Sequence, residues 1–291
     1  MTIRSVLLTL FTLFLLLFSS CSSEKSVTPD VPPVEPDTEE PEEEKSWQLV
    51  WEDEFDGDEL DMDKWSYQLG DGCDISQDLC GWGNNELQYY TEREENIFLE
   101  DGFLTITAHE EDHEGSDYTS ARIITKNKGD WRFGRIEVRA KLPQGQGIWP
   151  AIWMLPTDET FGGWPQSGEI DIMEMVGHEP ETVHGTVHFG DPWPNNQWEG
   201  EPYSLENGIF ADNYHIFSIE WEQNKIDFFV DGNLFFTVTP STVEPKQYPF
   251  NYKFHMIMNI AVGGNWPGNP DSTTEFPQTM SVDYVRVYQF K

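Results

Sequence analysis

The amino-acid sequence predicts an all-β protein in which two antiparallel sheets pack against each other as a sandwich. The first observation is the alternation of apolar and polar residues in short segments such as 132–142, a period of two that half-buried antiparallel strands show. The second is that the turns between such segments are rich in Gly, Asn and Asp. No segment keeps a sustained helical period, so packed sheets are favoured over helices.

A hairpin is predicted where Asp231-Gly232-Asn233 separates two apolar segments, because the glycine supplies the positive φ of a tight turn. Residues 47–291 suit one large β domain without an internal repeat. The alternation of half-buried strands recurs in that domain at 104–108, 217–221 and 285–287.

The first 20 residues predict a secretion signal. Arg4 precedes an apolar run at 6–18 that is too short for a spanning helix with the usual flanks. Two serines before Cys21 resemble a bacterial lipoprotein signal, which implies a lipidated Cys21 and an exported protein anchored to the outer membrane, at the cell surface or in the periplasm. Ordinary cleavage and release is the alternative.

Residues 21–46 predict a disordered tether, because Pro, Glu, Asp, Ser and Thr dominate and little apolar surface can be buried. An acidic binding tail is the alternative. The net charge is −36, and without the nine acids and three bases of the first 46 residues it is −30. Such a domain repels nucleic acid and other polyanions. We therefore expect a neutral partner. We also expect a monomer that meets the membrane only through its N-terminal lipid.

Apart from Cys21, the only cysteines are Cys73 and Cys80, on either side of a short loop. In an oxidising compartment they are predicted to pair, which would contribute roughly 2–3 kcal/mol at most by closing the loop. Free thiols are the alternative. A metal site is disfavoured because no His or third Cys lies at ligand spacing.

Three acids interrupt an apolar segment at 167–175 that reads as a buried strand. Glu169 and Asp171 share one face of such a strand, whereas strict alternation would send Glu174 into the core. A bulge at Ile172 or Met173 would shift the phase by one residue and return Glu174 to the face of the other two acids.

Three carboxyl groups on one face suit retaining glycoside hydrolysis, which uses two carboxyl groups about 5–5.5 Å apart and needs no cofactor. We assign Glu169 as the nucleophile, Glu174 as the acid/base, and Asp171 as the residue that positions and tunes them. Crowding of like charges raises at least one pKa of the set, as a general acid requires. The alternative is an edge strand that carries solvated acids.

His184 and His188 are four residues apart on a presumed neighbouring strand and therefore share a face. A metal-binding pair is one interpretation, but a pair lacks the third ligand of a zinc site. We favour a hydrogen-bonding role for His188 near the three acids.

The pattern Glu-x-Asp-x-x-Glu formed by the three acids resembles the catalytic signature of glycoside hydrolase family sixteen, in the bulged form of its laminarinases, agarases and carrageenases. The resemblance covers 47–291 and implies a jelly roll whose concave face is the substrate cleft. The segments that resemble the laminarinase branch, in the family's order, are 82–91, 121–126, 147–156, 184–190 and 263–268.

The same resemblance implies which side chains bind sugar. Trp149 and Trp153 face the same way on a strand and would stack on sugar rings in the cleft, although core burial is the alternative for any one tryptophan. Trp266, in a glycine-rich loop, would close the glycone side. Arg122 and Asn85 would hold sugar hydroxyls upstream of the cut. Whether Asn85 or its neighbour Asn84 points inward is left open by the sequence.

A structural calcium ion is a further implication of the resemblance. Its ligands would be Glu54, the carbonyl of Gly102, and Asp283, and oxygen ligands suit this cation. Ordinary surface acids are the alternative.

The sequence therefore predicts an exported, retaining, endo-acting hydrolase of β-1,3-glucan (laminarin), with mixed β-1,3-1,4-glucan as a further substrate. A galactan (agarose-type) hydrolase with the same mechanism is one alternative. A non-catalytic β-glucan-binding lectin is the other, although a lectin has no need for Glu169, Asp171 and Glu174 together.

Overall fold

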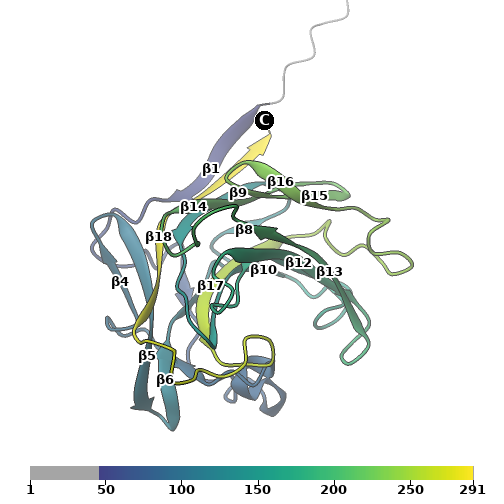
Figure 1. Ribbon diagram of the computed structural model, residues 1–291. Helices are drawn as coiled ribbons and strands as arrows, with labels where there is room; N and C mark the ends of the chain where they lie inside the picture. Colours follow the sequence, from purple (N-terminus) through teal and green to yellow (C-terminus); the bar gives the residue numbers. More distant parts are fainter. Residues whose placement is uncertain (1–45, 291) are drawn as a thin grey trace, which may run out of the picture. The chain divides into compact units, whose positions relative to one another are not determined.

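The structure is a computed structural model that describes residues 46–290 (Figure 1). The predicted signal segment, Cys21 and all but the last residue of the predicted tether lie outside these residues. Within the described part of the chain, no helix is long and apolar enough to cross a membrane.

Residues 46–290 form two sheets, as the alternation predicts, and every strand pair among them but one is antiparallel. The first sheet runs in the order β16-β15-β14-β9-β18-β5-β6-β3, with β1 also paired to β18 and β4 to β5. Its strands are β1 (Trp47–Asp53), β3 (Gln88–Tyr90), β4 (Ile97–Glu100), β5 (Phe103–His113), β6 (Ser116–Ser120), β9 (Gly134–Lys141), β14 (His215–Glu222), β15 (Lys225–Val230), β16 (Asn233–Val238) and β18 (Gln278–Phe290).

The second sheet runs in the order β13-β12-β11-β10-β17-β7-β2, with β8 paired to β17. Figure 1 shows β10, β12, β13 and β17 of this sheet as a curved layer beneath β9, β14, β15 and β16 of the first. The strands of the second sheet are β2 (Ser66–Tyr67), β7 (Arg122–Ile124), β8 (Asp130–Trp131), β10 (Ile148–Pro156), β11 (Glu169–Glu174), β12 (Thr182–Gly190), β13 (Asn196–Ser204) and β17 (Phe254–Val262).

The core lies between the two sheets, and each strand directs alternate side chains into it. In β10, Ile148 and Ile152 are fully buried in the core. In β17 all nine residues are buried, because this strand lies in the middle of its sheet. The face of the second sheet that points away from the core is the concave face, and it carries the polar residues described below.

The predicted elements recur at their expected places. The segment 132–142 contains β9, 104–108 lies in β5, 217–221 in β14 and 285–287 in β18. The predicted hairpin joins β15 to β16, and Asp231 and Gly232 have φ of 49° and 77°.

Cys73 and Cys80 form a disulfide, as predicted for an exported chain. The bond closes a loop that enters a short 3₁₀ segment, η1 (Gln77–Gly83). Trp82 at the end of this segment is buried and donates from its indole N–H to the carbonyl of Gly70 at 3.2 Å. The loop thus fixes Trp82 at one side of the concave face.

Candidate active site

Strand β11 contains the predicted bulge. Against β10, pairing passes from Asp171 directly to Met173, so that Ile172 has no partner. Against β12, pairing likewise passes from Asp171 to Glu174. Two consecutive residues, Ile172 and Met173, are both buried in the core instead of alternating between the faces. This bulge returns the side chain of Glu174 to the concave face. The three acids therefore share one face, as we predicted from the cost of burying an unpaired carboxylate in the core.

Each outer acid of β11 accepts a hydrogen bond from a different tryptophan. The indole N–H of Trp164 donates to Glu169 Oε2 at 2.8 Å, and that of Trp149 donates to Glu174 Oε1 at 3.1 Å. Trp164 lies in the connection between β10 and β11 and was not among the predicted site residues. The only signal for it in the sequence is its position five residues before Glu169, in a segment of glycine and proline.

Asp171 lies between the two glutamates and is 2% exposed. His188 points at it from β12, with Nε2 3.4 Å from Asp171 Oδ2 and 3.7 Å from Glu169 Oε1. Within 46–290, neither Asp171 Oδ2 nor His188 Nδ1 has a hydrogen-bond partner. Burial lowers the pKa of His188, which favours a neutral ring at pH 7. His188 therefore lies beside the acids, as predicted.

The three acids have raised pKa values. Burial raises the pKa of Glu169 to about 7 and that of Glu174 to about 7. Burial, and then the charges of both glutamates, raise the pKa of Asp171 well above its ordinary value. The Trp164 hydrogen bond, the charge of Arg122 and a hydrogen bond from Asp171 oppose the rise at Glu169. At neutral pH some of the three carboxyl groups are therefore protonated while others are ionised, and acid/base catalysis requires both forms.

Trp149 and Trp153 both lie on the concave face, opposite the buried isoleucines of β10. The indole N–H of Trp153 donates to Asn259 Oδ1 at 2.8 Å. Trp266 is 42% exposed, and its ring centroid lies 5.6 Å from that of Trp149 and 5.1 Å from that of His184. The glycine-rich loop that carries Trp266 thus lies beside Glu174, which pairs with His184.

Arg122 lies between two indoles, with its guanidinium carbon 4.3 Å from the ring centre of Trp82 and 4.8 Å from that of Trp153. Its Nε donates to Gln68 Oε1 at 2.6 Å, and the residue is 7% exposed. These contacts hold the side chain of Arg122 against the concave face at the start of β7.

The two neighbouring asparagines point to different partners. Asn84 is half-buried and donates to Glu86 Oε1 at 3.3 Å. Asn85 is exposed and donates to Asn265 Oδ1 at 2.8 Å, which joins its loop to the loop of Trp266. Asn84 is thus the residue that contacts the half-buried Glu86, while Asn85 is exposed and contacts the loop of Trp266.

A fourth acid, Glu86, was not predicted. Its Oε2 accepts from Gln88 at 2.8 Å and from the Tyr90 hydroxyl at 3.4 Å, and the Tyr90 hydroxyl accepts from Asn259 at 3.0 Å. Burial raises its pKa, and its charge helps to raise that of Glu174. A signal was present, because Glu86, Gln88 and Tyr90 alternate with Leu87 and Tyr89 in the period of a strand.

The predicted calcium ligands do not fit a cation as they are placed. Both carboxylate oxygens of Glu54 accept hydrogen bonds from Arg286, at 2.6 and 2.7 Å. Asp283 pairs with Arg139. Each carboxylate is therefore neutralised by a guanidinium, and two arginines at this position repel a dication. In the part of the chain that the structure describes, the acids that do gather with a histidine are Glu169 and Asp171, with His188.

A concave sheet lined with indoles, over which carboxyl groups of raised pKa stand on one strand, defines a carbohydrate-cleaving β-sandwich. The model of "Glycosyl hydrolases family 16" matches residues 82–286, and the chain belongs to this family.

Three similar proteins place the chain within the family. It is 44% identical over 256 residues to "Glucan endo-1,3-beta-glucosidase A1" of Niallia circulans. This match covers 83% of this chain but only 38% of that protein. It is 45% identical over 254 residues to "Beta-glucanase" of Rhodothermus marinus, covering 84% of this chain and 86% of that one. The crystal structure of the laminarinase catalytic domain from Thermotoga maritima MSB8 matches with a TM-score of 0.78 and 45% identity, over 84% of this chain and 98% of that one. This match confirms the predicted jelly roll with its concave face.

Proposed function

We propose that this protein is an endo-acting, retaining glycoside hydrolase that cleaves β-1,3-glucan, with mixed β-1,3-1,4-glucan as a further substrate. The observation that carries the proposal is the bulged strand β11, which sets Glu169, Asp171 and Glu174 on one indole-lined face. The substrate is supported by the names of the relatives in Niallia circulans and Rhodothermus marinus, which both refer to glucans.

The proposed reaction proceeds in two steps. Glu169 attacks the anomeric carbon while Glu174 gives its proton to the glycosidic oxygen, so that the leaving sugar departs with a free hydroxyl group. Glu174, now ionised, then takes a proton from water, whose oxygen displaces Glu169 and restores the original configuration. Asp171 supports the first step, because its hydrogen bond to Glu169 favours the ionised nucleophile.

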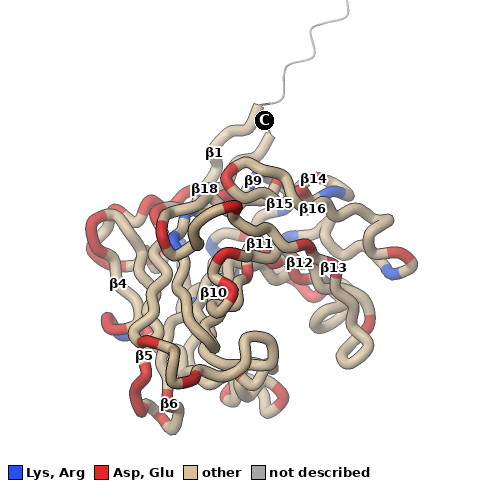
Figure 2. Tube along the Cα trace, in the orientation of Figure 1, with Lys and Arg blue, Asp and Glu red and all other residues tan. Residues whose placement is uncertain are grey.

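The substrate would lie across the strands of the concave face. Trp149, Trp153 and Trp266 offer apolar faces to sugar rings, while Arg122 offers donors to hydroxyl groups, with Asn85 at the rim and His188 beside the acids. A neutral polymer is favoured by charge: Figure 2 shows Asp and Glu on many loops and Lys and Arg at few places, in line with the net charge of −36. Sulfated galactans would be repelled.

No cofactor takes part in the proposed mechanism. Dialysis against EDTA is expected to leave both kcat and Tm unchanged. A calcium ion at Glu54, Gly102 and Asp283 would require both arginine pairs to open. A fall in Tm after EDTA that calcium reverses, and that Asp283→Asn removes, would establish such a site.

The proposed location is the outer membrane, with the lipid on Cys21 as the only membrane contact and the enzyme domain as a monomer. The support is the signal-like segment before Cys21. Wild-type protein should fractionate with membranes and Cys21→Ala should be soluble. Unmodified, wholly soluble wild-type protein would contradict the anchor.

The test of the function is product analysis on laminarin, lichenan, agarose and carrageenan. The wild type should cut laminarin internally, cut lichenan to some extent and leave carrageenan intact. Glu169→Gln keeps the size of the side chain but cannot attack, so it should bind laminarin oligosaccharides without cleaving them. Faster release of sugars from agarose would favour a galactan hydrolase, and binding by the wild type without cleavage would favour a lectin.

A further inference from the structure

The edge strand β13 has two chemically different faces. Trp198, Gly200 and Pro202 pair with His188, Thr186 and His184 of β12, and directly paired residues point to the same face, so all of them lie on the concave face. The residues between them point the other way and are polar or acidic: they are Gln197, Glu199 and Glu201. An exposed edge strand therefore turns its uncharged side to the cleft and its charged side to water.

Trp198 is the one large side chain that β13 contributes to the concave face. It is 62% exposed, and its partner His188 pairs in turn with Glu169 on β11. Two strand spacings separate the backbones of Trp198 and Glu169, roughly 10 Å. The indole thus lies beyond the acids but within one or two sugar rings of them.

The next concave-face residue of β13 after Trp198 is Gly200, which has no side chain. A Cβ at Gly200 would meet the Gly185 carbonyl oxygen at 2.8 Å and Thr186 Oγ1 at 2.9 Å, so that no side chain fits there. An exposed indole beside a glycine and a proline offers an apolar surface with hydrogen-bonding groups, among them the Thr186 hydroxyl, at its border, which is what a pyranose ring needs.

The proposed role of Arg122 assigns Trp198 a side of the cut. Arg122 lies on β7, on the opposite side of β11 in the order of the sheet. Because Arg122 is proposed to hold hydroxyl groups upstream of the cut, Trp198 lies downstream, where the leaving sugar binds. Hydrophobic residues scattered singly on a surface are common, but this one is aligned with the acids and lies on the uncharged face of its strand.

We propose that Trp198 is a stacking platform for a sugar ring on the leaving-group side, and that it makes the enzyme prefer substrates that extend beyond the cut. The inference rests on the proposed function. It names a specificity-determining residue from a strand for which the sequence suggested no role.

The test compares two substrates in each variant: a long laminarin oligosaccharide, and an activated aryl glucoside whose leaving group is a single small ring. In Trp198→Ala, kcat/KM for the oligosaccharide should fall about tenfold further than kcat/KM for the aryl glucoside. Trp198→Phe keeps a ring and should recover a large part of the loss. Gln197→Ala, on the other face of the same strand, is the matched control and should change neither value.

Equal losses on both substrates in Trp198→Ala would show a merely structural role and overturn the inference, as would no loss on either. In both cases cleavage of laminarin by the wild type would leave the proposed function standing. Wild-type protein that fails to cleave laminarin would remove the proposed function and this inference together.

Discussion

Glu169 and Glu174, the outer acids of β11, differ in the tryptophan that donates a hydrogen bond to each, whereas burial raises the pKa of both. Trp164 donates to Glu169 and Trp149 to Glu174, and each hydrogen bond lowers the pKa of its carboxyl group. Burial outweighs these hydrogen bonds, so that both pKa values are raised to about 7. The proposed roles need opposite protonation states, so that the two indoles should control opposite limbs of the pH–rate profile.

Replacing each indole by phenylalanine should move a different limb. In Trp164→Phe the pKa of Glu169 rises, and the nucleophile has to be ionised to react. We therefore expect kcat/KM on the acidic side of the profile to fall about fivefold, because losing a hydrogen bond worth about 1 kcal/mol changes an equilibrium by that factor. In Trp149→Phe the pKa of Glu174 rises, and the enzyme should stay active to higher pH. Profiles of kcat/KM from pH 5 to 9 test this. Trp193→Phe, at a side chain that is 73% exposed, should match the wild type; a shift of the same limb in both variants would contradict the assignment.

Asp171 should lower the stability of the fold above acidic pH. Its pKa is raised in the folded protein, so its contribution to stability is full below the unfolded pKa and is lost as the pH rises through the folded value. Asp171→Asn should therefore be more stable at pH 7.5 by about 2 kcal/mol, or roughly 4–8 °C in Tm. At pH 4 the two proteins should melt nearly together. A lower Tm for the variant at pH 7.5 would show that the carboxylate is stabilising.

The shared face of the three acids could be predicted at the scale of residues, because strand alternation and the cost of a buried carboxylate depend only on neighbours in the sequence. The contacts of Glu86 and Trp164 could not. Glu86 reaches Asn259 through Tyr90, and the two ends of that path are more than 170 residues apart. Only the folded chain brings such groups together.

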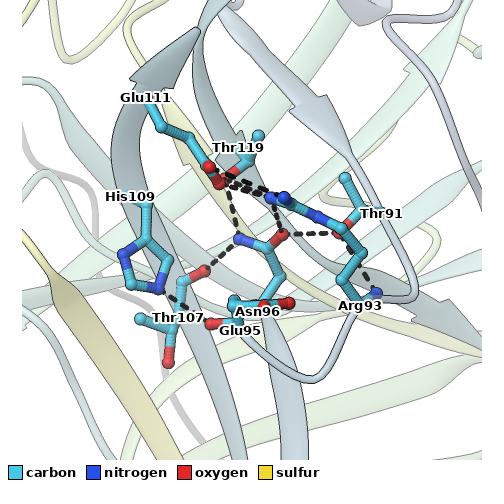
Figure 3. Close-up of polar contacts among 8 residues, drawn as sticks. All are labelled: Thr91, Arg93, Glu95, Asn96, Thr107, His109, Glu111 and Thr119. Atoms are coloured by element: carbon cyan, nitrogen blue, oxygen red, sulfur yellow. Dashed lines mark hydrogen bonds and ion pairs between the residues drawn. The ribbon is translucent and has the colours of Figure 1, made fainter. Parts of the chain in front are cut away.

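At the scale of elements, the antiparallel strands were predictable but the parallel pair of β3 and β6 was not. These strands have three and five residues, too few for a pattern. A polar cluster centred on Asn96 joins the segments next to these two strands (Figure 3). Asn96 is fully buried and donates to the Thr107 carbonyl at 3.1 Å and to Thr119 Oγ1 at 2.9 Å. It accepts a hydrogen bond from Arg93 at 3.0 Å. Arg93 also pairs with Glu111. The cluster ties the connection between β3 and β4 to the β5–β6 hairpin.

Removing the centre of this cluster should destabilise the protein. Asn96→Ala leaves the Thr107 carbonyl and its neighbours buried without partners, which costs about 2–3 kcal/mol, or roughly 4–12 °C in Tm. Thermal unfolding measures the change. The adjacent Glu95→Ala is the control, because only the backbone carbonyl of Glu95 joins the cluster, accepting from His109 at 2.8 Å. Equal Tm values for Asn96→Ala and the wild type would mean that water replaces the lost amide.

At the scale of the whole molecule, the sandwich could be predicted from alternation and turn composition. The curvature that makes one face concave could not, because it depends on how the two sheets twist and pack together. The jelly roll was predicted through the resemblance to a family, and the match to the Thermotoga maritima laminarinase domain confirms it. The calcium position implied by the same resemblance stays a prediction, and its two carboxylates are paired with arginines.

The proposed mechanism depends most on the separate roles of Glu169 and Glu174, and one measurement tests both. Glu174→Ala should still form the covalent intermediate from a substrate whose leaving group needs no acid, and added azide should restore turnover because a small anion can replace the activated water. Nuclear magnetic resonance should show the azide product in the β configuration. Azide rescue of Glu169→Ala should instead give the α product. A β product from Glu169→Ala together with an α product from Glu174→Ala would reverse the two roles, and no effect of either substitution on hydrolysis would contradict the account as a whole.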